Sequence, residues 1–222
     1  MFYYVEDKLF LSRVREVCGK IMQLLCRILK EEYDIGARFN LVGSGGRNLV
    51  TQNESEPIDL DYNLEIVRCE NIRDGRRIKE CVRKAFNEAL ALYGWKDCQD
   101  STSVLTTEYR EFKEGNHTPF SMDVCIVRID EEGQEYRLIH QKTGFAKYDW
   151  YHWDQTPNAK EIRKKADAIK KAGKWAEVRE RYRDIKNNYL NRNDHDHPSF
   201  VCYIEAVNNV YNKICNVPKN KK

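Results

Sequence analysis

The sequence has almost no excess of charge of either sign. Its 38 lysine and arginine residues are balanced by 35 aspartate and glutamate residues, which leaves a formal net charge of +3. A protein that coats nucleic acid with its whole surface carries a much larger positive charge. Any basic contact surface of this chain is therefore expected to be local.

The sequence also lacks an apolar run of membrane-spanning length. The first residues, 1–7, have neither a basic start nor a small-residue cleavage site of the kind that marks a secretory signal. The eight cysteines include no C-x-x-C pair, which argues against a zinc site and favours reduced thiols in apolar segments. These absences predict a cytoplasmic protein without a membrane partner.

Alternating and helical hydrophobic patterns fill the first two thirds of the chain. Apolar residues at intervals of three and four predict helices, and strict alternation predicts strands. The expected helices are 9–29 and 78–93, and the expected strands are 37–42, 58–66, 102–112, 120–129 and 135–141. This order predicts an α/β (α+β) domain over residues 1–145, with a mixed β-sheet flanked by helices.

The remaining residues, 146–222, are expected to form a helical region that frames the acceptor or the base side of a site. Pro157 and Pro198 suit the first positions of helices, and residues 191–197 are polar and turn-rich, as in a loop. The aromatic segment 148–153 is expected to follow the end of the sheet and to pack at a junction, or to stack on a nucleobase. His195 and His197 are assigned no role.

Asp59 and Asp61 lie on one face of the expected strand 58–66, because side chains alternate along a strand. Two neighbouring carboxylates repel each other unless a cation compensates them. Asp123 is a lone acid in the otherwise apolar strand 120–129, and a buried charge also requires a partner. If the two strands are adjacent, the three carboxylates form the donor set that Mg²⁺ or Mn²⁺ takes at a nucleotide site.

The segment Gly43-Ser44-Gly45-Gly46 ends the strand 37–42 and predicts a tight turn. Glycine lets backbone amides approach phosphate oxygens closely, and the Ser44 hydroxyl adds a donor. Arg47 and Asn48 follow directly, and the guanidinium of Arg47 suits a triphosphate. Gly43, Ser44, Arg47 and Asn48 are therefore predicted to bind nucleotide.

Gly43-Ser44, Asp59-Leu60-Asp61 and Asp123 together resemble the motif set of the DNA polymerase β-like nucleotidyltransferase superfamily. The resemblance covers about the first 130 residues, with a slightly long gap between Ser44 and Asp59 that residues 51–57 can absorb. It implies that the three aspartates hold Mg²⁺ and are the catalytic residues. It also implies that a nucleoside triphosphate, with ATP as the expected one, binds at Gly43-Ser44, and that its nucleoside monophosphate is transferred to a hydroxyl.

Other interpretations remain open on the sequence alone. The acid pair can be the solvated face of an antiparallel strand. The fold can also serve as a catalytically silent nucleotide-binding or regulatory module, and the basic segment 160–186 can belong to an RNA-binding protein. The acceptor is open among a small-molecule hydroxyl, an RNA end, a protein side chain and a second nucleotide.

Overall fold

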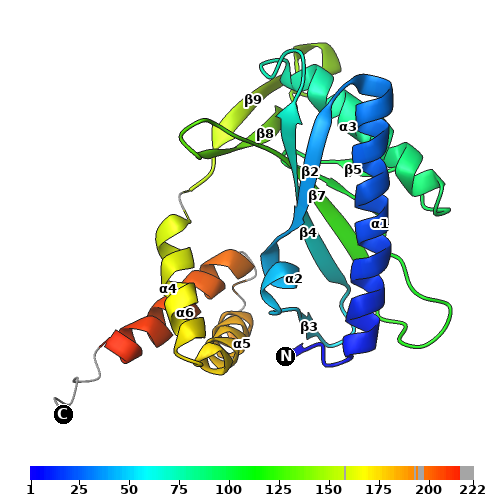
Figure 1. Cartoon of the computed structure of the whole chain (residues 1–222). Helices are drawn as coiled ribbons and strands as arrows, with labels where there is room; N and C mark the ends of the chain where they lie inside the picture. Colours follow the sequence, from blue (N-terminus) through cyan, green and yellow to red (C-terminus); the bar gives the residue numbers. More distant parts are fainter. Residues whose placement is uncertain (158, 193, 195–197, 216–222) are drawn as a thin grey trace. The chain divides into compact units, whose positions relative to one another are not determined.

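A computed structural model gives the fold of the chain (Figure 1) and describes residues 1–157, 159–192, 194 and 198–215. The chain divides into two compact units. The sheet unit comprises Val5–Asn48 and Glu56–Thr156, and the helical unit comprises Met1–Tyr4, Leu49–Ser55 and the chain from Pro157 onward. In the described part of the chain, no helix combines the length and the apolar content needed to cross a membrane.

The sheet unit is built around one mixed seven-stranded sheet. Its elements are α1 (Lys8–Tyr33), β2 (Gly36–Leu41), α2 (Gly43–Arg47), β4 (Ile58–Arg68), α3 (Gly75–Ala91), β5 (Gln99–Asp100), β6 (Val104–Thr106), β7 (Phe120–Ile129), β8 (Glu135–Gln141), the short 3-10 helix η1 (Ala146–Tyr148) and β9 (Trp150–Gln155). The strand order is β2-β4-β7-β6-β5, and β8 joins β7 to β9. Among the strands of the described residues, only β4 and β7 pair in parallel. The predicted mixed sheet flanked by helices is confirmed.

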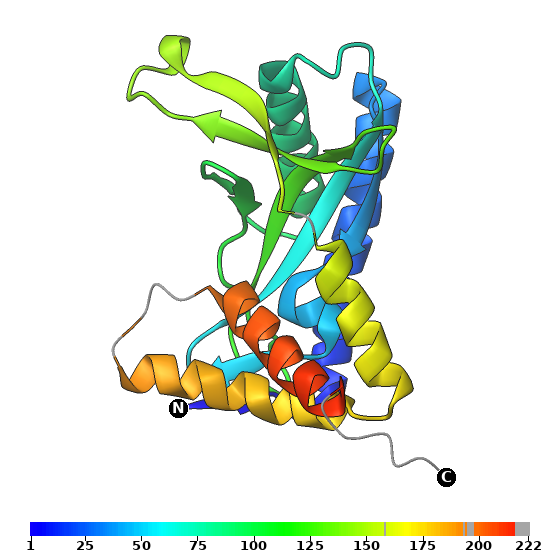
Figure 2. The same ribbon diagram turned by 90° about the vertical axis from the view of Figure 1, so that its left-hand side faces the viewer.

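Helices α1 and α3 lie side by side on one face of the sheet (Figures 1 and 2). Each begins at an aspartate whose side chain accepts a hydrogen bond from the helix backbone, Asp7 for α1 and Asp74 for α3. The strands turn alternate residues toward these helices, and those residues form the core: Ile58, Leu60, Tyr62 and Leu64 of β4, and Phe120, Met122, Val124 and Ile126 of β7. The other face carries Asp59, Asp61 and Asn63 of β4, and Ser121 and Asp123 of β7.

The strand expected over residues 102–112 is largely wrong, because the structure keeps only β6. Ser101 ends the ladder before β6, since its backbone N–H and its hydroxyl both bond to the carbonyl oxygen of Val104. After β6, the hydroxyl of Thr107 accepts a hydrogen bond from the backbone N–H of Met122 at 3.0 Å. The backbone N–H of Thr107 still donates to the carbonyl oxygen of Met122 at 3.0 Å, so the hydroxyl takes the place of only the second backbone bond of this pair.

The sequence predicted that the sheet ends before Tyr148. In the structure, the sheet continues beyond that residue. The aromatic segment forms β9, which pairs antiparallel with residues 136–141 of β8. The indole N–H of Trp153 donates to the carbonyl oxygen of Ile72 at 2.7 Å, just before α3. This strand mixes aromatic and polar residues and has no apolar run, so the sequence pattern did not predict it.

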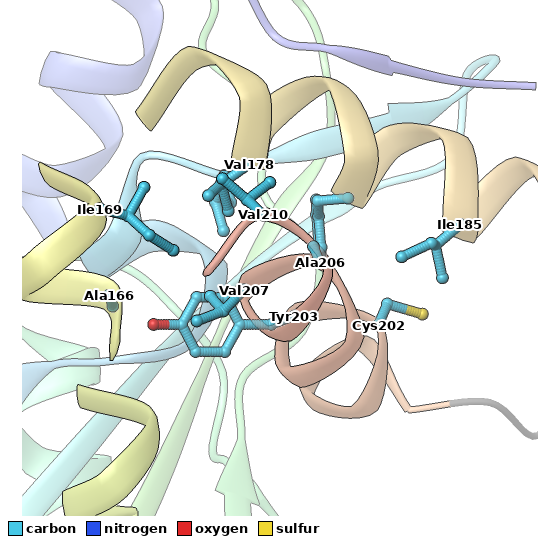
Figure 3. Packing of buried hydrophobic residues seen from close by; sticks show 11 residues of the cluster. Ala166, Ile169, Val178, Ile185, Cys202, Tyr203, Ala206, Val207 and Val210 are labelled. Carbon is cyan, nitrogen blue, oxygen red and sulfur yellow. The ribbon is translucent and has the colours of Figure 1, made fainter. Parts of the chain in front are cut away.

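The helical unit has a small core of its own (Figure 3). It contains β1 (Phe2–Tyr4), β3 (Thr51–Asn53), α4 (Lys160–Lys171), α5 (Trp175–Asn191) and α6 (Ser199–Cys215). Ile169 of α4, Val178 of α5 and Val207 of α6 are fully buried in this core. The expected polar stretch 51–57 in fact includes β3, which pairs with β1. The predicted helices are confirmed, whereas most of the predicted loop 191–197, with His195 and His197, lies outside the described residues.

Candidate active site

Asp59 and Asp61 lie on the face of β4 that points away from α1 and α3. Their neighbours Leu60 and Tyr62 are buried on the helix side, with exposed fractions of 0% and 2%. Asp59 is exposed and Asp61 is half-buried. The sequence prediction that both acids share one face of a strand is therefore confirmed.

Asp123 is brought to the same place by the pairing of β7 with β4. The register puts Asp61 opposite Asp123 and Asp59 opposite Ser121. Directly opposed residues of paired strands point to the same face, so the three carboxylates share the open face of the sheet. The strand adjacency that the metal-site hypothesis requires is confirmed.

The electrostatics of the three acids are unfavourable without a cation. Burial, followed by the negative charges of Asp123 and Asp59, raises the pKa of Asp61 to about 6. Burial also raises the pKa of Asp123, against the opposing effect of a hydrogen bond from Thr106. Acids that raise one another's pKa across two strands are typical of functional sites.

Hydroxyl groups from neighbouring strands contact two of the acids. The Thr106 hydroxyl donates to Oδ1 of Asp123 at 2.6 Å, and the Ser121 hydroxyl donates to Oδ1 of Asp59. Neither residue belongs to the site predicted from the sequence. For Ser121, its place two residues before Asp123 on the same strand face is a usable signal, whereas no local pattern places Thr106.

The backbone at Gly43 approaches Asp61 more closely than a residue with a side chain would allow. Gly43 has φ +58°, and a Cβ built on it would fall 1.8 Å from Oδ2 of Asp61. The backbone N–H of Val42 donates to the carbonyl oxygen of Asp61 at 2.8 Å, which fixes this approach. The segment is not the tight turn that was expected, because residues 43–47 continue as the short helix α2.

The structure places Arg47 and Asn48 at the end of α2. Arg47 donates from its guanidinium to the carbonyl oxygen of Gly43 at 2.8 Å, and its charge opposes the raised pKa of Asp61. Asn48 ends the helix with φ 58° and accepts a hydrogen bond from Arg15 at 3.0 Å. Arg15 also donates to the carbonyl oxygen of Gly45 at 3.1 Å, which ties α2 to α1.

The donor set suits a divalent metal ion in its chemistry. Three carboxylates on one strand face supply the hard oxygen ligands that Mg²⁺ takes. Across the described residues, however, no three His, Cys, Asp or Glu side chains already stand in a group that could hold a metal ion. A metal ion therefore requires the three carboxylates to close around it.

Two other groups of residues singled out in the sequence lie elsewhere. Tyr151 and Trp153 of the aromatic segment face α3, where the guanidinium of Arg76 lies 4.9 Å from the centre of the Tyr151 ring. The basic segment 160–186 forms α4 and most of α5 in the helical unit. Neither group is assigned a functional role by its contacts.

Comparison with known proteins gives no match to a family model and none to a curated protein sequence. Solved structures do match. The Escherichia coli MS115-1 CdnC structure with ATP has a TM-score of 0.58 at 13% identity, covering 91% of this chain and 61% of that one. The Vibrio cholerae DncV structure in its 3'-deoxy ATP bound form has a TM-score of 0.56 at 15% identity, covering 98% of this chain and 54% of that one.

A third structure is the Elizabethkingia meningoseptica CdnE cyclic dinucleotide synthase with GTP and Apcpp. Its TM-score is 0.53 at 11% identity, and the match covers 95% of this chain and 78% of that one. The present chain thus spans only 61% and 54% of the CdnC and DncV chains. Likenesses at identities this low establish the fold alone, and the chain shares the fold of these three structures, a mixed β-sheet flanked by helices.

Proposed function

We propose that the chain is a metal-dependent nucleotidyltransferase, which transfers a nucleoside monophosphate from a nucleoside triphosphate to a hydroxyl acceptor and releases pyrophosphate. The observation that carries the proposal is the direct register of Asp61 with Asp123, with Asp59 on the same face. Solved structures with this fold and with bound ATP, 3'-deoxy ATP or GTP support the choice of a nucleoside triphosphate.

Mg²⁺, or Mn²⁺ in its place, would be held by Asp59, Asp61 and Asp123, and when bound it neutralises charge on the triphosphate and at the reacting phosphorus. The raised pKa of Asp61 supports this assignment, because a nearby cation offsets both the burial and the repulsion that raise it. The remaining work of the site is to position the two substrates.

Gly43 and Ser44 are the proposed contacts of the triphosphate. Gly43 brings the backbone against Asp61 with no side chain between them, so phosphate oxygens can lie beside the acids. The Ser44 hydroxyl is a further donor, and Arg47 adds positive charge at the end of α2. Asn48 contributes by ending α2, where its side chain accepts from Arg15.

Asp123 is proposed to orient the acceptor hydroxyl and to take its proton. The register of Asp123 opposite Asp61 supports this role, because it places the carboxylate beside an acid that would hold the metal ion. The acceptor oxygen forms a bond to the α-phosphorus as the bond from that phosphorus to the bridging oxygen breaks, and pyrophosphate leaves. Among the four acceptor classes, the cyclic dinucleotide synthase with this fold favours the hydroxyl of a second nucleotide.

The proposed roles of the two parts of the chain are those predicted from the sequence. The catalytic role belongs to residues 1–145, which contain all three acids and the glycine segment. The region 146–222 is proposed to frame the acceptor, and its helices α4, α5 and α6 have their own core. A catalytically silent module is disfavoured, since the three carboxylates and the close approach at Gly43 are all present.

The test follows label from [α-³²P]nucleoside triphosphates with Mg²⁺ or Mn²⁺, with pyrophosphate measured in parallel. The double variant Asp59→Ala plus Asp61→Ala is expected to lose activity by at least on the order of 10²-fold. The matched control is Glu65→Gln, on the same face of β4, where Glu65 pairs with Arg38 at 2.8 Å. Equal activity of wild type and double variant, or binding of nucleotide without any pyrophosphate, contradicts the proposal.

A further inference from the structure

Two of the three acids are held by a hydroxyl on the neighbouring strand. Ser121 lies directly opposite Asp59 in the β4–β7 pairing, and Thr106 lies directly opposite Asp123 in the β6–β7 pairing. In both pairs the hydroxyl donates to Oδ1 of the carboxylate. The same kind of hydrogen bond therefore occurs twice, once from Ser121 of β7 to Asp59 and once from Thr106 of β6 to Asp123.

A hydroxyl bond to one carboxylate oxygen restricts the rotation of the carboxylate and leaves its second oxygen for another ligand. Carboxylates that bind metal ions are themselves commonly hydrogen-bonded, and loss of such a partner costs about 10- to 100-fold in metal affinity or activity. The bond from Thr106 to Asp123 is short, at 2.6 Å, as expected when the acceptor is charged.

The surroundings of Thr106 show that its position is tightly fixed. Strand β6 has only three residues, and its central residue Leu105 is fully buried. The next residue, Thr107, is 4% exposed, and its hydroxyl accepts from the backbone N–H of Met122 at 3.0 Å. The contacts of Leu105 and Thr107 therefore fix the backbone of Thr106 beside Asp123. Little conformational freedom is lost when the hydrogen bond forms.

Ser121 is fixed in a different way. It is 1% exposed and lies within β7, which pairs with β4 on one side and with β6 on the other. Its hydroxyl is therefore placed by the centre of the sheet, and no loop movement is needed to bring it to Asp59.

We propose that Thr106 and Ser121 are positioning residues of the metal site, which hold Asp123 and Asp59 with one oxygen each directed to a divalent cation. This inference rests on the proposed function, because it requires that the three acids bind metal. It adds a residue of β6 to a site that the sequence motifs confine to β4, β7 and the glycine segment.

The experiment measures binding of Mn²⁺ by electron paramagnetic resonance, with and without a saturating non-hydrolysable ATP analogue, on the full chain. The variants are Thr106→Val, which keeps the shape and removes the hydroxyl, Thr106→Ser, which restores it, and Ser121→Ala. Thr107→Val is the matched control, because it removes a neighbouring hydroxyl that bonds only to backbone. Circular dichroism and a thermal melt accompany each variant.

Thr106→Val and Ser121→Ala are expected to bind Mn²⁺ about 10- to 100-fold more weakly than wild type. Thr106→Ser and Thr107→Val are expected to retain wild-type affinity, even though Thr107→Val lowers the melting temperature. Wild-type affinity in both Thr106→Val and Ser121→Ala overturns this inference and leaves the proposed function standing. Absence of Mn²⁺ binding by the wild-type chain overturns both. An equal loss in Thr107→Val shows that only general damage to the fold is measured, and this result also overturns the inference.

Discussion

The raised pKa of Asp61 makes a quantitative prediction for the metal-free protein. The folded pKa is about 6, against an ordinary value of 3.8. The unfolded chain therefore releases the proton of Asp61 at a lower pH than the folded chain. Between about pH 4 and pH 6 the folded state binds more protons, so its stability falls as the pH rises, and it stays at the lower level above pH 6. Two pKa units correspond to about 3 kcal/mol.

Asp61→Asn removes this penalty because the amide carries no charge. In the presence of a chelator, the variant and the wild type are expected to be similarly stable near pH 4. At pH 7 the variant is expected to be more stable by up to about 3 kcal/mol. The assay is urea denaturation of both proteins at several pH values between 4 and 7, with the stability difference plotted against pH. Saturating Mg²⁺ is expected to stabilise the wild type and not the variant.

A stability difference that does not change between pH 4 and pH 7 would refute the reasoning. So would a variant that is less stable than the wild type at pH 7. Taking the difference between the two proteins matters, because other carboxylates of the chain have pKa values shifted downward, such as Glu108 next to Lys96. Those groups affect both proteins equally, and their contribution cancels.

Three further substitutions test separate parts of the fold and the site. Gly43→Ala would place its Cβ 1.8 Å from Asp61 at φ +58°, so we expect loss of nucleotidyl transfer and about 1–3 kcal/mol of destabilisation, measured by label transfer and urea denaturation. Lys79→Met removes the buried ammonium group that lies 3.1 Å from Oδ1 of Asp100, while His140 still contacts Oδ2, and is expected to cost about 1–3 kcal/mol in urea denaturation. Ile169→Ala opens a cavity in the helical unit, with an expected cost of about 2–5 kcal/mol, while a spectroscopic probe placed in the sheet unit retains its unfolding midpoint. A shared midpoint shift would show that the two units unfold together.

The parts of the site that local patterns control could be predicted from the sequence. Alternation along β4 puts Asp59 and Asp61 on one face, and the structure confirms it. Asp123 stands out because a charge in an apolar strand is costly. The parallel pairing of β4 with β7 joins residues about sixty positions apart, so the resemblance of motifs was needed to expect it.

The features that were missed depend on contacts between distant residues. Thr106 bonds to Asp123 only because β6 pairs with β7, and nothing near Thr106 in the sequence signals an acid partner. Strand β9 was missed for a similar reason. Its His152 and Trp150 stack with ring centres 4.7 Å apart, and such polar and aromatic residues do not give the alternation of a half-buried strand.

The most direct test of the central claim is a crystal structure of the protein with Mg²⁺ and a non-hydrolysable nucleoside triphosphate. The account predicts a metal ion with oxygens of Asp59, Asp61 and Asp123 at about 2.0–2.1 Å, and a triphosphate against Gly43 and Ser44. A triphosphate bound elsewhere on the chain, or bound at Gly43 with no metal ion at the three aspartates, would contradict it.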